Sequence, residues 1–299
     1  MHELLNIAPE VANAISNNKP VVALESTVIR YGLPRPENLQ TALRLEAVVR
    51  EGEAVPATIA VLEGQLSVGL NDDQIARLAG ENYIEKVSTR DIPVVVARQT
   101  DGVTTVASTI WIAHRAGIQV FATGGIGGVH YGTLPDVSAD LPELARTPII
   151  VVCSGAKIVL DLPATREWPE THAVTVVGYQ CDELPAFYSR GTGLPIDARA
   201  DTPAEVIDIF RAQRSLGIES ALLVCVPVPE RFEVPAEKLQ AVLTTALEDA
   251  EFEGIVGPAL TPFLLSLMSE RSGGATLRAN IALLENNARV AAEIARELV

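Results

Sequence analysis

The chain has 299 residues, 48% of them hydrophobic and 4% aromatic, and its 38 acidic and 23 basic side chains give a net charge of −15. An apolar fraction this high excludes a disordered chain, because enough surface can be buried to offset the lost conformational entropy. The acidic charge argues against nucleic acid as a partner, since polyanions bind basic surfaces. A small anion can still bind if a few cations gather in one cleft.

The three cysteines, Cys153, Cys181 and Cys225, are odd in number and widely spaced, which predicts neither a disulfide framework nor a zinc motif. Cys153 and Cys225 lie in apolar runs and are interpreted as small core residues. The N-terminus lacks the pattern of a signal peptide, and no uncharged apolar run reaches the roughly 18 residues of a membrane span. We therefore expect a soluble, cytoplasmic protein with no membrane partner.

Short apolar runs alternate with amphipathic helical patterns along the chain. Most runs are apolar at every position, which is typical of parallel strands covered on both faces. The expected strands are Val21–Leu24, Ala57–Leu62, Pro93–Ala97, Gln119–Thr123, Ile149–Cys153, Val174–Val177 and Ala221–Val226.

Three segments between or after these runs carry helix signals. Residues 202–217 begin with a capping box, formed by Thr202 and Glu205, and end at a glycine. Residues 236–253 place apolar side chains on one face, which needs a core to cover it. A last helix is expected over residues 277–298.

No linker, charge block or low-complexity tract divides the chain, and the repeated strand-then-helix order predicts one α/β domain over residues 1–299. The irregular spacing favours a layered α/β/α sandwich with a mostly parallel central sheet, while periodicity leaves a (β/α)₈ barrel open. In both architectures ligands bind beyond the carboxyl ends of the strands.

Two side chains that follow buried strands are candidates for catalysis. Glu25 follows the first strand, where partial burial favours the protonated acid, a proton donor; a turn or helix-capping carboxylate is the alternative. Lys157 follows Ile149–Cys153, where burial beside another cation favours the neutral amine, a nucleophile for carbonyl carbon. The alternative for Lys157 is a surface lysine of the ordinary kind, such as Lys238.

Two neighbouring segments have the composition of binding loops. The glycines of Gly124–Gly128 let the backbone approach an anion, although the segment matches neither nucleotide-binding template and a tight turn is the alternative. His130 alone would more often be structural. Asp136 and Asp140 share a face if their segment is helical, with Ser138 between them, and oxygen ligands suit Mg²⁺ or Mn²⁺. Taken in isolation, helix capping by Asp136 or Asp140 is the more common explanation.

Hydroxyl-rich strand ends form a third kind of signal, in Lys86–Arg90 and Thr104–Thr109. Hydroxyls and backbone amides at a helix start, with a lysine nearby, make a phosphate cradle, and simple capping is the alternative. The convergence of these features on one sheet edge favours a metal-assisted enzyme acting on a phosphorylated sugar or carbonyl compound, with a Schiff base as one route.

Several segments taken together resemble pseudouridine-5′-phosphate glycosidases. They are Ala23–Thr27, Val55–Ala60, Thr104–Thr109, Phe121–His130, Asp136–Leu141, Gly178–Gln180, Leu184–Phe187 and Thr261–Leu265. The resemblance runs from about Ile7 to the last helix, and the stretch from Val120 to Tyr131 is the most specific part of it.

The resemblance implies reversible cleavage of pseudouridine 5′-phosphate into uracil and ribose 5-phosphate by a homotrimer, with Mn²⁺ or another divalent cation such as Mg²⁺. It implies Glu25 as the proton donor, Lys157 as the nucleophile that forms a Schiff base with the opened sugar, and Asp136 as the metal ligand. The substrate-binding positions that it implies are Lys86, Val106, His130, Ser138, Ala139, Asp140 and Asn280.

The family commonly continues after Glu25-Ser26-Thr27 with a small residue and then His-Gly-Met-Pro, whereas this chain has Arg30 and Tyr31 before Gly32. Tyr31 keeps an aromatic polar group with a different acid–base character, which bears on the recognition of uracil. A class I aldolase-like lyase is the alternative enzyme, but it would not need the Asp136 cluster. A catalytically silent nucleotide-binding module would predict losses at Glu25, Lys157 or Asp136, and all three are present.

Overall fold

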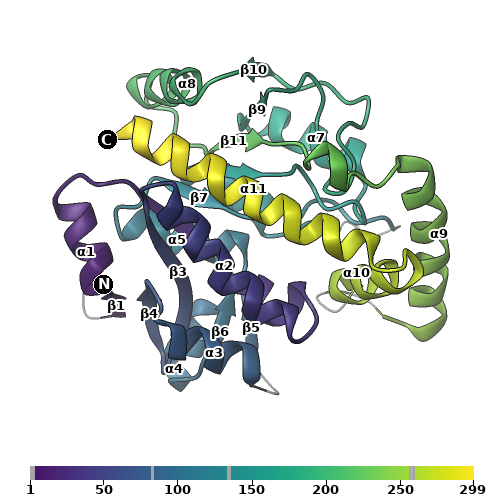
Figure 1. Ribbon diagram of the computed structural model, residues 1–299, viewed down its shortest axis with the longest axis horizontal. Helices are drawn as coiled ribbons and strands as arrows, with labels where there is room; N and C mark the ends of the chain where they lie inside the picture. The colour runs from purple at the N-terminus through teal and green to yellow at the C-terminus, as the bar shows by residue number, and fades with distance from the viewer. Residues whose placement is uncertain (1–3, 82–83, 133–135, 256, 258–259) are drawn as a thin grey trace.

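A large mixed sheet, parallel in most of its strand pairs, lies at the centre of the protein and is flanked by helices (Figure 1). The computed structural model describes residues 4–81, 84–132, 136–255, 257 and 260–299. The strands are β1 (Leu5–Ile7), β2 (Val21–Leu24), β3 (Val55–Leu62), β4 (Gln65–Val68), β5 (Glu85–Val87), β6 (Gly102–Thr104), β7 (Val120–Ala122), β8 (Ile150–Cys153), β9 (Thr175–Tyr179), β10 (Ala198–Ala200) and β11 (Leu222–Cys225).

The strands follow the order β1–β4–β3–β2–β7–β8–β11–β9–β10, with β6 beside β3 and β5 beside β6. This order confirms the predicted α/β class with a mostly parallel sheet. Because β1 and β10 end the path without pairing to each other, the sheet is open and the barrel alternative is excluded. The antiparallel pairs that β3 forms with β4 and β6 were not predicted.

Helices cover both faces of the sheet. They are α1 (Pro9–Ser16), α2 (Glu37–Glu51), α3 (Asp72–Gly80), α4 (Ile92–Arg98), α5 (Val106–Arg115), α6 (Asp140–Leu144), α7 (Leu162–Thr171), α8 (Pro203–Ser215), α9 (Ala236–Glu253), α10 (Leu260–Arg271) and α11 (Ala275–Leu298). In Figure 1, α11 crosses in front of the central strands and packs on α2 and α8. The parallel connection β7–α6–β8 advances along the sheet in the opposite direction to β2–α2–β3, so right-handed crossovers put α6 on the other face, and α5 packs against α6 there.

The central strands are buried at every position, which explains why they lack polar–apolar alternation. This holds for β2, β7, β8 and β11. Parallel pairing with helices on both faces keeps water from both sides of these strands. One consequence is that β2, β7 and β8 run in the same direction and end at one edge of the sheet.

The segment Pro93–Ala97 lies in helix α4, so the prediction of a strand there was wrong. The buried residues of α4 are Ile92 and Val95, which have the spacing of a helix face. Pro93 suits the first turn, where its missing N–H breaks no helical hydrogen bond. A short apolar run is assigned as strand or helix by its flanks, because its periodicity alone is ambiguous.

The other predicted elements are present, with ends that differ from the predicted ones by at most two residues. At the start of α8, the hydroxyl of Thr202 accepts from the N–H of Glu205 (3.3 Å), as the predicted cap requires. The carboxylate of Glu205 accepts instead from the N–H of Asp201 (2.7 Å), so the reciprocal bond of the capping box is displaced by one residue. The strands that were missed, β1, β4, β5, β6 and β10, have only three or four residues each.

Cys153 and Cys225 are fully buried, as predicted for core residues, and face each other across the β8–β11 pair. All three cysteines are free thiols. Burial in the sheet therefore accounts for Cys153 and Cys225 without a redox or metal role.

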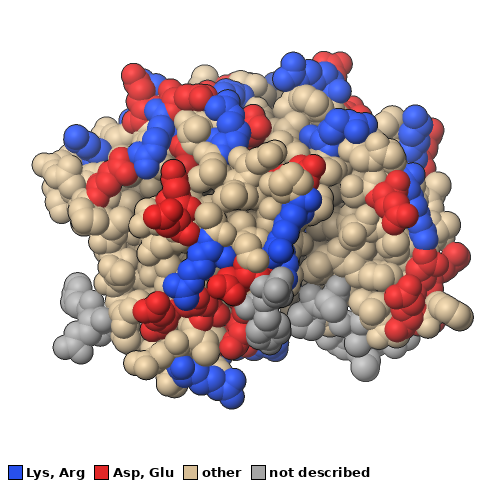
Figure 2. Space-filling view, turned by 60° about the horizontal axis from the view of Figure 1, so that its bottom comes forward, with Lys and Arg blue, Asp and Glu red and all other residues tan. Residues whose placement is uncertain are grey.

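Charged side chains of both signs are interspersed on the face drawn in Figure 2. Ion pairs such as Arg199–Asp182 (2.7 Å) and Arg44–Glu51 (2.6 Å) are exposed, and such pairs contribute at most about 1 kcal/mol each. Within the described ranges, no helix is both long enough and apolar enough to cross a membrane.

Candidate active site

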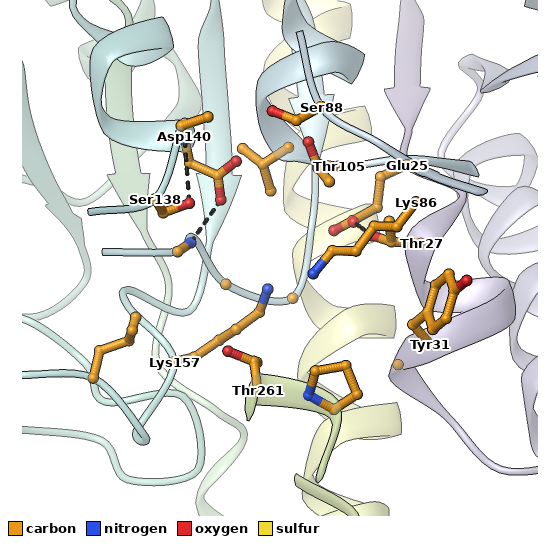
Figure 3. A pocket seen from close by; sticks show the side chains of 18 of the residues that line it. Glu25, Thr27, Tyr31, Lys86, Ser88, Thr105, Ser138, Asp140, Lys157 and Thr261 are labelled. Atoms are coloured by element: carbon orange, nitrogen blue, oxygen red, sulfur yellow. Dashed lines mark hydrogen bonds between the residues drawn. The ribbon is translucent and has the colours of Figure 1, made fainter. Parts of the chain in front are cut away.

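The carboxyl ends of β2, β7 and β8 open into a cavity of about 520 Å³, to which α10 and α11 contribute further walls (Figure 3). Every site residue predicted from the sequence lines this one cavity. These residues are Glu25, Lys86, Val106, His130, Asp136, Ser138, Ala139, Asp140, Lys157 and Asn280. The fold thus brings together side chains that are up to 255 positions apart, from Glu25 to Asn280.

Glu25 directly follows β2 and is held by two threonines. Leu24 pairs with Ala122 of β7, so Glu25 and Thr123 leave the sheet side by side. The hydroxyl of Thr123 donates to Oε1 of Glu25, and the hydroxyl of Thr27 donates to Oε2. Glu25 is only 8% exposed, so these hydroxyls, rather than bulk water, orient its carboxyl group at the cavity wall.

Lys157 lies on the turn after β8, which is hydrogen-bonded to the glycine-rich loop after β7. The N–H of Lys157 donates to the carbonyl of Ile126 (3.1 Å), and the N–H of Ile126 donates to the carbonyl of Gly155 (3.0 Å). These bonds set the direction in which the lysine leaves the backbone. In Figure 3 its amine points into the cavity, towards the amine of Lys86.

Gly155 on this turn is a backbone position that requires glycine. Its φ is 72°, and a Cβ placed there would lie 2.0 Å from the carbonyl oxygen of Pro185.

We expect Gly155→Ala to lower the free energy of unfolding by roughly 3 kcal/mol, because the backbone strain and the clash with rigid backbone add together. Urea denaturation measures the loss. Gly193→Ala is the matched control, since Gly193 also has positive φ (73°) but no atom of the described residues lies within 4 Å of its Cβ position. Equal losses in the two variants would contradict the role of the clash.

Lys86 reaches the cavity from β5 and is held among charges of both signs. Burial lowers the pKa of Lys86, and the positive charge of Lys157 lowers it further. The carboxylates of Asp140 and Glu25 act in the opposite direction and raise it. Two lysines converging on one cavity in a protein of net charge −15 make a local site for an anionic ligand.

Hydroxyls and a helix N-terminus lie beside Lys86. Thr105 caps α5, and the first residue of that helix, Val106, lines the cavity. The hydroxyl of Ser88 is buried and, within the described residues, has no hydrogen-bond partner. Ser88 also lines the cavity, so a ligand oxygen can satisfy it. A lysine, hydroxyls and a helix N-terminus are the groups that bind phosphate.

Asp136 and Asp140 would share a face only if their segment were helical, and this condition is not met, because α6 begins at Asp140. The carboxylate of Asp140 accepts from the N–H of Ala107 (2.9 Å) and from the N–H of Gly127 (2.8 Å). These bonds fasten the glycine-rich loop to the first turn of α5. A Cβ on Gly127 would lie 2.3 Å from Oγ of Ser138, so only glycine fits this close packing.

Asp136 and His130 offer an oxygen and a nitrogen at the cavity rim. Oδ2 of Asp136 lies 3.6 Å from Nδ1 of His130, and this nitrogen is buried without a hydrogen-bond partner among the described residues. The other ring nitrogen, Nε2, lies 3.3 Å from the hydroxyl of Thr261 on α10. The described residues contain no cluster of three or more His, Cys, Asp or Glu side chains that could hold a metal. Asp136 supplies a single carboxylate, so a hard cation held there would keep most of its water ligands.

Several cavity residues were not singled out as site residues from the sequence. Tyr31, on the π-helical turn η2 (Val28–Gly32), lines the cavity and donates its hydroxyl to the carbonyl of Ile84. Apolar side chains of Phe187, Leu265 and Leu284 form another part of the wall. Phe187 belongs to a segment that resembles the family, and Tyr31 is a position where this chain departs from the family. A sequence pattern alone does not show that these two side chains face a cavity.

The family model for indigoidine synthase A-like proteins matches residues 10–297. The chain belongs to this family. A pseudouridine-5′-phosphate glycosidase of Solibacter usitatus is 50% identical over 296 residues, covering 98% of this chain and 99% of the relative. The family resemblance predicted from the motifs is therefore confirmed over the whole chain.

Two solved structures have the same fold as this chain. The prealnumycin C-glycosynthase AlnA in complex with ribulose 5-phosphate is 40% identical, with a TM-score of 0.91, covering 99% of this chain and 97% of that one. An indigoidine synthase A-like protein from Thermotoga maritima is 37% identical, with a TM-score of 0.91 and coverage of 99% and 96%.

Proposed function

We propose that the chain is a pseudouridine-5′-phosphate glycosidase, which reversibly cleaves its substrate into uracil and ribose 5-phosphate. The observation that carries this proposal is the placement of Glu25 and Lys157 in one cavity, beside the cradle of Lys86, Ser88 and the α5 N-terminus. An acid, an amine and a phosphate site are the groups that a Schiff-base route on a sugar phosphate needs. The names of relatives that are 50% identical over 98% of this chain support the same activity.

The chemistry begins with opening of the sugar. A C–C glycosidic bond offers no leaving-group oxygen or nitrogen to protonate, so the two-carboxylate scheme of ordinary glycosidases does not serve. Glu25 instead donates a proton to the ring oxygen, and the bond between that oxygen and C1′ breaks. Thr27 and Thr123 hold the carboxyl group in place for this transfer.

Lys157 then bonds to C1′ through its amine. As the C1′–N bond becomes an iminium, the C1′–C5 bond to uracil breaks, and C5 takes up the proton that the amine lost on bonding to C1′, which gives uracil. Water adds to the iminium and releases ribose 5-phosphate, which restores the free amine. In the reverse direction the electron-rich C5 of uracil adds to the same iminium.

The phosphate and a cation complete the proposed site. Lys86, Ser88, Thr105 and the backbone at Val106 bind the phosphate, with Ser138, Ala139 and Asp140 lining the same cavity. His130 and Asn280 complete the proposed substrate contacts. Asp136 would hold Mn²⁺, or another divalent cation such as Mg²⁺, and the bound cation would order water around the sugar and its phosphate.

The direct test incubates the purified protein with pseudouridine 5′-phosphate and Mn²⁺ and follows uracil by chromatography. Uracil and ribose 5-phosphate should appear in equal amounts. An aldolase-like lyase would split the sugar chain and release no uracil, so the same assay separates the two activities. Absence of uracil from both pseudouridine 5′-phosphate and uridine 5′-phosphate would contradict the proposal.

The role of Asp136 is tested by metal binding in the absence of substrate. We expect Asp136→Asn to weaken Mn²⁺ binding by roughly 10- to 100-fold, measured from the paramagnetic resonance signal of free Mn²⁺. Chelation of divalent cations should suppress turnover, and added Mn²⁺ should restore it. Asp182→Asn is the control, because Asp182 is an exposed carboxylate paired with Arg199. Equal Mn²⁺ affinity in the two variants would show that Asp136 is not the ligand.

Three further properties belong to this proposal. Residues 1–299 form one domain. A single family model that spans residues 10–297 supports this. The protein acts as a homotrimer, on the strength of the family resemblance, and light scattering measures its mass. It works in the cytoplasm, where its free thiols stay reduced and nucleotides from RNA breakdown occur.

A further inference from the structure

Asn287 is a fully buried carboxamide on α11 that lies below the cavity rather than in its wall. Its Nδ2 donates to the carbonyl of Thr123 (2.8 Å) and approaches the carbonyl of Gly124 (3.4 Å). The same nitrogen lies 3.1 Å from the hydroxyl of Ser154, whose oxygen also lies 3.3 Å from Oδ1 of Asn287. One side chain thus bridges the residues that immediately follow β7 and β8.

The Thr123 end of this network leads to Glu25. Thr123 is 2% exposed and follows the last residue of β7. Its carbonyl is held by Asn287, while its hydroxyl donates to Oε1 of Glu25. A β-branched threonine has few favourable χ1 rotamers, so fixing its backbone restricts the directions in which the hydroxyl can donate. The position of the Glu25 carboxyl group therefore depends on a helix that contributes no group to the proton transfer itself.

The Ser154 end leads to the turn that carries Lys157. The N–H of Ser154 donates to the carbonyl of Gly124 (2.9 Å), and the carbonyl of Ser154 accepts from the N–H of Phe187 (2.9 Å). Three residues later, the N–H of Lys157 bonds to the loop after β7. Asn287 therefore bonds to both segments that shape the cavity: the one that positions Glu25 and the one that carries Lys157.

Geometry of this kind matters to the rate. A displacement of about 1 Å of a reacting group can cost on the order of 100-fold in rate, because reaction needs the atoms close and aligned. Thr27 alone cannot fix the carboxyl group of Glu25, since a single hydrogen bond leaves it free to turn about that bond. The second bond, from Thr123, removes this freedom.

We propose that Thr123 and Asn287 are positioning residues that hold the carboxyl group of Glu25 in a set place relative to Lys157. This inference rests on the proposed roles of Glu25 and Lys157. Nothing in it requires Thr123 or Asn287 to touch the substrate, and neither lines the cavity.

The test compares Thr123→Val, which removes the hydroxyl at nearly constant shape, with Thr123→Ser, which keeps it. We expect Thr123→Val to lower kcat by about 10- to 100-fold with KM changed less than about twofold, and Thr123→Ser to stay within about threefold of wild type. Thr147→Val is the matched control: the hydroxyl of Thr147 donates to the buried carboxylate of Glu143 (2.6 Å) away from the cavity. It should lose comparable stability but keep kcat.

A double-mutant cycle extends the test to Asn287. If both residues act through Glu25, the losses in kcat for Thr123→Val and Asn287→Leu should be markedly less than multiplicative when combined. Multiplicative losses would show that Asn287 acts independently of Thr123, which contradicts its proposed role. If Asn287→Leu does not fold, the comparison of Thr123→Val with Thr123→Ser alone tests the proposal.

A crystal structure of Thr123→Val gives a readout that does not depend on turnover. The carboxyl group of Glu25 should turn away from its wild-type position, while the backbone around Lys157 stays in place. An unmoved carboxyl group, an unchanged kcat, or a Thr123→Ser variant as slow as Thr123→Val would each overturn the inference. Failure of the proposed function would differ, because the wild-type protein would then release no uracil.

Discussion

Lys157→Ala should abolish uracil release, with a loss in kcat on the order of 10⁴-fold or more, while binding of the phosphate is kept. The loss is large because the amine forms the covalent bond that accepts the electrons of the breaking C–C bond, and alanine offers no substitute. The fold should survive, since Lys157 is held through its backbone N–H and its side chain points into the cavity.

The same experiment can identify the amine that reacts. Lys86 lies in the same cavity, and burial together with the charge of Lys157 lowers the pKa of Lys86, so it is the competing nucleophile. Incubation with ribose 5-phosphate and a borohydride reductant, followed by peptide mass spectrometry, should place the reduced sugar adduct on Lys157. Lys86→Met is the control, and it should raise KM through the phosphate yet leave the adduct on Lys157. An adduct that persists in Lys157→Ala would show that the nucleophile is misassigned, and its location on Lys86 would identify that residue instead.

Glu25→Gln should lower kcat by roughly 10²- to 10⁴-fold, which is the usual contribution of a general acid. Glutamine has nearly the same shape and can still bond to the hydroxyls of Thr27 and Thr123, so the cavity should keep its form. What is lost is the proton delivered to the ring oxygen. The rate of uracil release under saturating substrate measures the effect.

A second measurement distinguishes the role of Glu25 as the acid from that of Lys157 as the nucleophile. Free ribose 5-phosphate opens unaided in water, so it should still form the reduced adduct on Lys157 in the Glu25→Gln variant. Glu46→Gln is the matched control, because Glu46 is buried outside the cavity and accepts from the hydroxyl of Thr58 (2.6 Å). Burial raises the pKa of Glu46, so its neutral amide should be well tolerated. A Glu25→Gln variant within about tenfold of wild type would contradict the assignment of the acid.

Most secondary structure was predictable because its signals are local. The uniformly apolar runs of β2, β8 and β11 indicated buried parallel strands, and the Thr202 cap marked the start of α8. Prediction failed where neighbours in space decide the outcome. The valines after Pro93 read as a strand, but packing buries only one side of that segment, and it forms α4.

The candidate site was predicted in its residues and only partly in its arrangement. The position of Glu25 after β2 and of Lys157 after β8 followed from the sequence, since chain direction places both at the carboxyl edge of a parallel sheet. The sequence paired Asp136 with Asp140 only on the condition of a helix, and α6 does not reach Asp136. Asp140 instead bonds to the N–H groups of Ala107 and Gly127, two contacts that depend on how α5 approaches the loop.

The sequence by itself determined the α/β class, the family, and the presence of an acid, an amine and hydroxyls at strand ends. The tertiary structure alone decided which strand ends are neighbours, and therefore which side chains hold the reacting groups. Thr123 meets Glu25 across 98 positions, and Asn287 meets Thr123 across 164. Such contacts follow from strand order and helix packing, which are set by the burial of whole elements. A local sequence pattern indicates that a helix or strand is buried, but it does not indicate which other element packs against it.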